Sequence, residues 1–189
     1  MSRLLEAAVL QLSSAGVPGL THRKVEQRAG LAQGSVKYYF GSSDALVEGI
    51  LQHLADQSLP LVLTVSPAER EAAEKGAGEI LLRHAQQVAK EMLAQPDYVR
   101  ARLHLYLHAA GHPRWQALVT AARDRLVAQV AESLPGPSSA AAARFVCAVV
   151  DGILLDQVSA PSRTVERFAG RYLLAAGGAA ATIAVEQEA

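Results

Sequence analysis

Residues Thr21 to Leu46 read THRKVEQRAGLAQGSVKYYFGSSDAL, and this stretch decides the fold. It predicts a short helix over Thr21–Ala29, which the turn Gly30-Leu31-Ala32 ends. A second short helix follows from Gln33 to Tyr38 or Tyr39, and Phe40-Gly41-Ser42 ends it. Gly30 suits the turn because glycine adopts the left-handed conformation without a steric penalty. Two helices joined by a short turn that contains glycine form a helix-turn-helix, whose second helix enters the major groove of DNA.

Positive charge is concentrated in this stretch, although the chain as a whole is neutral. The 189 residues contain 18 Lys and Arg and 18 Asp and Glu, for a formal net charge of +0. Between Thr21 and Phe40 the net charge is +3, from four basic residues and one acid: Arg23, Lys24, Arg28, Lys37 and Glu26. Affinity for phosphate depends on charge placed locally at the groove. The patch therefore favours binding to nucleic acid.

Composition limits the class of protein. With 50% hydrophobic residues, the chain can form one or two domains with a core. The single Cys147 cannot form an internal disulfide, which favours a reducing compartment, and its apolar surroundings indicate a packed thiol. The start, MSRLLEAAVLQL, lacks the features of a secretory signal, and no apolar run is long enough to span a membrane. We expect a soluble cytoplasmic protein with no membrane partner.

The rest of the chain is predicted to be helical, because alanine is abundant and apolar residues recur every three or four positions. The segment Leu59–Val65 is interpreted as a linker or a frayed helix end. Ser42 and Ser66 are expected to cap the helices that follow them. The fold class is all-α with about nine helices, seven of them outside the motif: Ser2–Ala15, Ser42 to Gln57, Ser66 to Pro96, Asp97–Ala110, Pro113 to Leu134, Ser139–Val158 and Arg163–Val185.

This arrangement resembles the TetR-type (tetracycline-repressor) family of bacterial transcriptional regulators. The number and order of the helices extend the resemblance over the whole chain. Within the motif it rests on residues at the family's spacing, which are Ala29-Gly30-Leu31, Gly34, Val36, Tyr39-Phe40 and Asp44-x-Leu46. It implies an N-terminal three-helix DNA-binding domain over residues 1–45 and a C-terminal helical domain over residues 46–189. The second domain would bind a ligand and form a homodimer, and the helix over about 42–57 would link the two.

Three positions depart from the family's pattern. Ala32 stands where the family usually caps the third helix with Ser or Thr, and the loss of such a cap costs about 1 kcal/mol. We therefore expect this helix to be only marginally stable without DNA. Lys37 replaces a common tyrosine and would contact phosphate as a point charge. Ser43 replaces a residue that is often basic, so one phosphate contact becomes neutral.

The resemblance also assigns the DNA contacts. Thr21 caps the second helix, and Thr21 and His22 at the N-terminus of this helix would approach a backbone phosphate. Side chains of the third helix would read bases or contact phosphate, and Tyr39 is favoured over Tyr38 as the phosphate contact. Val36 and Phe40 are expected in the core. The full set of candidate DNA-binding residues is Thr21, His22, Arg23, Gln33, Gly34, Ser35, Lys37, Tyr38, Tyr39 and Ser43.

The remaining helices imply a ligand and a partner chain. A small apolar or amphipathic effector would favour a conformation of the dimer in which the two DNA-binding domains are wrongly spaced for a palindromic operator. The DNA would then be released. Trp115 can be either a core residue or part of the ligand pocket. The candidate pocket residues are Leu81, Val88, Met92, Leu103, Leu107, Trp115, Val119 and Val149. The candidate dimer-interface residues are Phe145, Ile153, Phe168, Tyr172 and Ala176.

Other classes of function find less support. His104 and His108 are spaced to share a helical face that could bind zinc, but no Cys or Glu is placed to complete a site. We expect no metal and no cofactor. An enzyme would need a convergent acid, base or nucleophile, and no such set is present, so we predict a protein that is not an enzyme. The alternative function is a ligand-binding helical regulator that acts as an activator or does not bind an operator.

Overall fold

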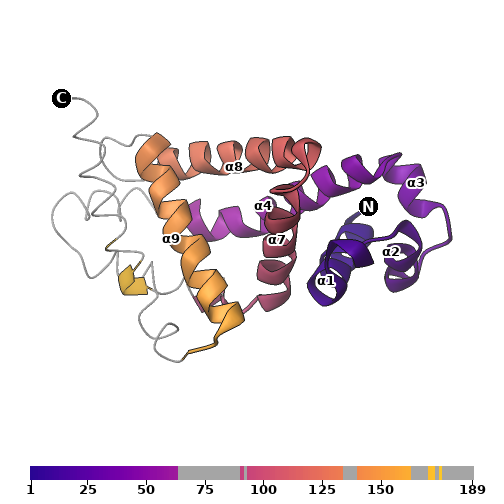
Figure 1. Ribbon diagram of the computed structural model, residues 1–189, viewed down its shortest axis with the longest axis horizontal. Coiled ribbons are helices and arrows are strands. Elements are labelled where there is room, and N and C mark those ends of the chain that lie inside the picture. Colours follow the sequence, from indigo (N-terminus) through magenta and orange to yellow (C-terminus); the bar gives the residue numbers. More distant parts are fainter. Residues whose placement is uncertain (64–89, 92, 134–139, 163–169, 173–174, 176–189) are drawn as a thin grey trace. The chain divides into compact units, whose positions relative to one another are not determined.

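The computed structural model describes residues 1–63, 90, 91, 93–133, 140–162, 170–172 and 175. These residues belong to two compact units. The first unit comprises Met1–Gln57 and Gln95–Arg123, and the second comprises Ser58–Ala94 and Asp124–Ala189. Helices make up the regular structure of the described residues (Figure 1), which confirms the predicted all-α class.

The helices follow the chain in the predicted order (Figure 1). Most bounds lie close to those expected from capping residues and from the prolines at positions 96 and 113. The predicted helices over 66–96 and 163–185 lie almost entirely outside the described residues. The described helices are α1 Ser2–Gly19, α2 His22–Ala29, α3 Ser35–Phe40, α4 Ser43–Leu63, α7 Pro96–Ala109, α8 Pro113–Ser133 and α9 Ala140–Ser159.

Two bounds differ from the prediction. Gly16 leaves the helical conformation (φ 60°, ψ −171°) as expected, but a further helical turn carries α1 on to Gly19. Helix α4 continues to Leu63, so of the two interpretations of Leu59–Val65, a linker or a helix end, the helix end is correct for residues 59–63. A helix that already exists extends by forming one hydrogen bond per residue added, which makes extension much easier than nucleation.

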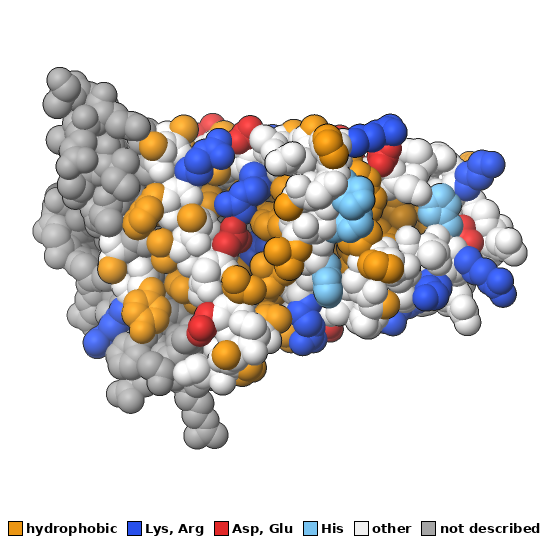
Figure 2. Space-filling model, viewed as in Figure 1, with side chains coloured by type: hydrophobic (Ala, Val, Ile, Leu, Met, Phe, Trp, Pro, Cys, Tyr) orange, Lys and Arg blue, Asp and Glu red, His pale blue; other side chains and the backbone are white. Residues whose placement is uncertain are grey.

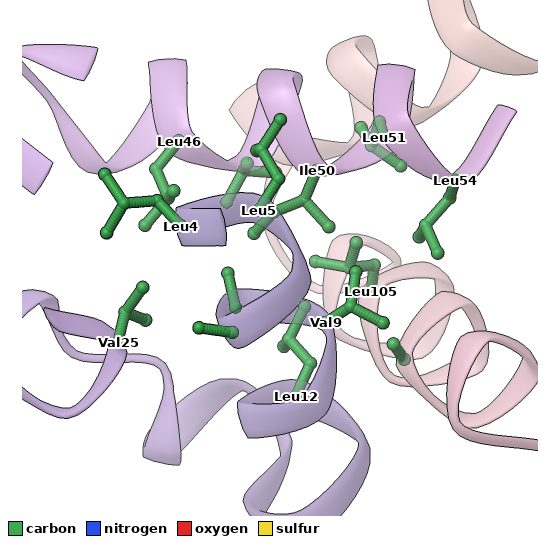
Figure 3. Packing of buried hydrophobic residues seen from close by; sticks show 14 of the residues in the cluster. Leu4, Leu5, Val9, Leu12, Val25, Leu46, Ile50, Leu51, Leu54 and Leu105 are labelled. Atoms are coloured by element: carbon green, nitrogen blue, oxygen red, sulfur yellow. The ribbon is translucent and has the colours of Figure 1, made fainter. Parts of the chain in front are cut away.

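A single apolar cluster holds the first unit together (Figure 3). Leucine and valine side chains of α1 point toward those of α4, with Val25 of α2 and Leu105 of α7 completing the cluster. Burial of one such side chain stabilises the fold by about 1.5–3 kcal/mol. The labelled members from α1 and α4 are Leu4, Leu5, Val9, Leu12, Leu46, Ile50, Leu51 and Leu54. This cluster fixes the positions of α1, α2 and α4, on which the short α3 depends.

Helix α4 approaches its neighbours closely at Gly49. A Cβ atom at this position would lie 2.9 Å from Phe40 Cε1 and 3.3 Å from Leu5 Cδ2. Phe40 packs against the core cluster and Val36 is fully buried, which confirms the prediction that both belong to the core. The apolar side of α3 is thereby held against the rest of the unit.

The second unit has a smaller described core. Val127 and Val130 of α8 pack with Ala143 and Cys147 of α9. Cys147 is buried among apolar side chains, in agreement with the predicted packed thiol. Among the residues that the structure describes, no helix is both long and apolar enough to cross a membrane.

Candidate DNA-binding site

Helix α2 begins and ends as its sequence predicts. Thr21 has an extended backbone, and its hydroxyl accepts a hydrogen bond from the Lys24 N–H at 3.4 Å. At the other end Gly30 adopts the left-handed conformation (φ 63°, ψ 38°), and Arg3 Nη2 donates to the Ala29 carbonyl at 2.9 Å. The cap and the turn of the helix-turn-helix are both confirmed.

Helix α3 begins later than predicted and has a different cap. It starts at Ser35 rather than Gln33, because Gly34 at its N-terminus has a positive φ of 95° that ends the preceding turn. The Glu26 carboxylate of α2 reaches this end. Its Oε1 accepts hydrogen bonds from the Gly34 N–H at 3.0 Å and from the Val36 N–H at 2.9 Å.

Ala32 supplies no cap to α3, as predicted, but the Glu26 side chain provides an acceptor in its place, and the marginal stability of α3 stays a prediction. Glu26 is 4% exposed and supplies the acceptor from another helix. Sequence reasoning counted Glu26 only as a negative charge in a basic patch. The available signal was its spacing: Glu26 lies three residues before Ala29, so the two share a face of α2, and Ala29 is buried.

The structure gathers the ten predicted contact residues on α2, α3, the turn between them and the start of α4. Eight of them are exposed, and His22 and Ser35 are partly buried. The Ser43 hydroxyl lies 3.4 Å from His22 Nε2, which connects the start of α4 to the start of α2. These residues can therefore contact the same ligand.

The two adjacent tyrosines differ in exposure. Tyr38 is 83% exposed and Tyr39 is 51% exposed. Their rings meet edge to face, with centroids 5.0 Å apart and an interplanar angle of 88°. Because both rings are largely exposed, both hydroxyls are available for a contact with phosphate. The preference for Tyr39 stays a prediction.

The charge that this region exposes to solvent is more positive than the formal net charge of its sequence suggests. Glu26 is the only acid between positions 21 and 43, and it is buried. Arg23, Lys24 and Lys37 are exposed. Arg28, in contrast, donates to Gln11 Oε1 and Ser14 Oγ of α1, both at 3.2 Å, so it serves the fold. Figure 2 shows Lys and Arg side chains at the end of the first unit that carries α2 and α3.

Comparisons with known proteins agree with this geometry. Residues 4–50 match the family model described as bacterial regulatory proteins of the tetR family. Residues 78–180, more than half of the chain, match the model described as the tetracyclin repressor-like C-terminal domain. The chain belongs to the TetR family.

Individual relatives extend the TetR-family match over most of the chain. The transcriptional regulator BetI of Burkholderia mallei is 28% identical over 160 residues, which cover 82% of this chain and 79% of BetI. A putative TetR-family regulator from a Rhodococcus species has a TM-score of 0.72 and 18% identity, with 95% and 99% of the two chains covered. The multidrug binding protein EbrR, solved with imidazole, has a TM-score of 0.64 and 24% identity, with 93% of each chain covered.

These matches confirm the predicted class of function. The chain is a DNA-binding transcriptional regulator with a helical C-terminal domain of the ligand-binding type. Its family consists of transcriptional regulators, which are generally not enzymes. The two similar solved structures, each under 25% identical, show that the TetR fold is shared.

The predicted pocket residues are dispersed. Leu81, Val88 and Met92 lie outside the described residues. Leu107 is 74% exposed, whereas Leu103, Trp115 and Val119 of the first unit and Val149 of the second are partly buried. Trp115 packs against the apolar cluster of the first unit and donates to Asp44. This arrangement supports a core role for Trp115, and the pocket stays a prediction.

The predicted dimer residues are only partly described. Phe145 is 36% exposed, Tyr172 is 45% exposed and Ile153 is partly buried. Phe168 and Ala176 lie outside the described residues. Large apolar side chains that reach the surface of a single chain are suited to an interface, so these positions also remain predictions.

The histidines of α7 and the following loop form a local stack. The rings of His108 and His112 have centroids 3.9 Å apart, and His108 meets Trp115 edge to face at 4.9 Å. Burial and the positive charge of His112 lower the pKa of His108. Within the described ranges no group of three or more His, Cys, Asp or Glu residues could hold a metal ion.

Proposed function

We propose that this TetR-family regulator is a repressor that binds a palindromic operator as a homodimer and leaves it when a small apolar or amphipathic effector binds. In this proposal residues 1–45 are the DNA-binding domain and residues 46–189 are the effector and dimer domain. The observation that carries it is the exposed basic face of α2 and α3, from which the only acid is withdrawn into the interior.

The contacts divide between bases and backbone. Helix α3 would lie in the major groove, where Gln33, Ser35 and Lys37 can bond to base edges or to phosphate. Backbone contacts position a protein on the duplex without reading its sequence. They would come from Thr21, His22, Arg23, Tyr38, Tyr39 and Ser43, with Gly34 allowing the backbone to come close to the DNA.

A dimer is supported by the surface of α9. Phe145 and Leu155 are exposed on this helix. Two heads related by two-fold symmetry would occupy half-sites one DNA turn, or a multiple of it, apart. The operator should therefore be palindromic. Because its partner is genomic DNA, the protein would act in the cytoplasm.

Release by an effector is supported by the family match and by the similar EbrR, whose solved structures contain imidazole, proflavin and ethidium. An effector shifts the equilibrium only if it binds the two conformations with different affinity. The first turn of α8 is bonded to the first turn of α4 through Trp115 and Asp44. A movement of the first turn of α8 would therefore move Asp44 in the first turn of α4, next to Ser43.

Selection of bound sequences from random DNA tests the proposal. A two-fold symmetric consensus is expected, bound by a dimer, with an affinity that falls steeply as salt rises. A screen of apolar and amphipathic compounds should then find one that releases this DNA. Recovery of no consensus, together with no salt-dependent binding, would show that this chain does not bind an operator.

A further inference from the structure

The buried carboxylate of Glu26 lies directly beneath the helix that is proposed to read DNA. It is 4% exposed, belongs to α2, and bonds two backbone N–H groups at the start of α3. The first N–H groups of any helix have no partner within that helix. In α3 the N-cap residue is Gly34, which has no side chain to satisfy them.

Helix α3 needs such support more than a longer helix would. It has six residues, and short helices are marginal in water because nucleation is costly. Gly34 adds conformational freedom at its start: its φ is 95°, and a Cβ atom there would meet no other atom within 4 Å. Packing therefore does not hold Gly34 itself in place. The apolar contacts of Val36 and Phe40 fix one side of α3, but they give no acceptor to the N–H groups at the start of the helix.

We propose that Glu26 is the positioning residue of the recognition helix. Its carboxylate joins α2 to the N-terminus of α3 and so sets the direction in which Gln33, Ser35 and Lys37 project toward the bases. This inference rests on the proposed function of α3. Glu26 itself is buried and would not contact the DNA.

The same hydrogen bonds restrict how α3 can meet DNA. A helix N-terminus often binds phosphate through its free N–H groups. Here the Gly34 and Val36 N–H groups are already bound to Glu26. Phosphate contacts near α3 must therefore come from side chains and from the start of α2. The loss of Glu26 should consequently reduce preference for the operator more than it reduces binding to random DNA.

Two substitutions of similar volume isolate the role of the acceptor. Glu26→Gln keeps a carbonyl oxygen that can accept both N–H groups, whereas Glu26→Leu fills the space without an acceptor. Affinity for the selected operator and for random DNA is measured at several salt concentrations. We expect the Gln variant to keep operator affinity within about threefold and the Leu variant to lose at least about tenfold, the equivalent of 1.4 kcal/mol. Equal operator affinities for the two variants would overturn the proposal.

A control separates positioning from general stability. Ser13 of α1 is also buried, and its hydroxyl donates to Asp97 Oδ1 of α7 at 2.6 Å within the same unit, away from α2 and α3. Ser13→Ala should lower the melting temperature and leave the ratio of operator to random affinity unchanged. Glu26→Leu should reduce that ratio. If both variants reduce the ratio equally, Glu26 acts only on the stability of the unit.

Amide hydrogen exchange of the free, unaltered protein gives a test that does not depend on the folding of a variant. The Gly34 and Val36 N–H groups should exchange at least about tenfold more slowly than the Gln33 N–H, because exchange requires their bonds to open. Equal exchange of the three would overturn the proposal. This measurement contains no DNA, so it is separate from the failure of operator binding, which would overturn the proposed function alone.

Discussion

Asp44 Oδ1 accepts a 3.0 Å hydrogen bond from Trp115 Nε1, while Asp44 Oδ2 lies 2.7 Å from Arg114 Nη2. One carboxylate thus joins the first turn of α4 to the first turn of α8. Asp44 also lies at the positive end of α4, where an acid is stabilised by the helix dipole. The side chain that the family resemblance marks as part of the DNA-binding motif therefore has a structural partner in α8.

The bond to Trp115 should contribute more to stability than the bond to Arg114. Arg114 is 80% exposed and exposed ion pairs contribute little, whereas the indole is partly buried. Asp44→Ala should lower the free energy of unfolding by about 1.5 kcal/mol, and Arg114→Ala by less than about 0.5 kcal/mol. Urea unfolding followed by circular dichroism measures both. Equal losses would mean that the ion pair dominates.

Lys37 should act through phosphate. Replacing Lys37 with Ala is expected to weaken binding to every DNA sequence and to reduce the salt slope by about 1. Lys90→Ala, an exposed lysine in the other unit, is the matched control and should change neither quantity. A changed base preference with an unchanged salt slope would assign Lys37 to a base instead.

Phe145 is expected at the dimer interface of α9. Phe145→Glu would place a charge against apolar surface and should yield monomers with weak operator affinity, because a monomer can occupy only one half-site. Ala128→Glu on the exposed side of α8 is the control and should stay dimeric. Light scattering with gel filtration measures the oligomeric state of both variants. A dimeric Phe145→Glu protein would move the interface elsewhere, including to the predicted Ala176.

The histidine stack should make stability depend on pH. Because the pKa of His108 is lowered below its usual value of 6.5, the unfolded chain takes up a proton more readily than the folded one. The stabilisation is therefore complete above about pH 6.5 and is lost as pH falls below it. His112→Gln removes the neighbouring charge and should raise the pKa of His108 toward 6.5, as an NMR titration would show. An unchanged pKa would leave burial as the sole cause.

Local features of the fold were predictable because their causes lie within a few residues. The cap at Thr21 and the left-handed turn at Gly30 each depend on a near neighbour in the chain. The all-α class and the DNA-binding motif follow from the same local signals. Leu59 to Leu63 shows the limit of this reasoning: the sequence left open whether this segment is a linker or a helix end, and the structure places it at the end of α4.

The sequence by itself determined the helical class, the helix-turn-helix and most of the residues that are exposed on it. Only the tertiary structure decided which side chains serve the fold instead. Glu26 and Arg28 both looked like members of a surface patch, yet one caps α3 and the other bonds to α1. Hydrogen bonds between residues eight to 17 positions apart depend on how two helices pack, and residue spacing within one helix does not encode that packing.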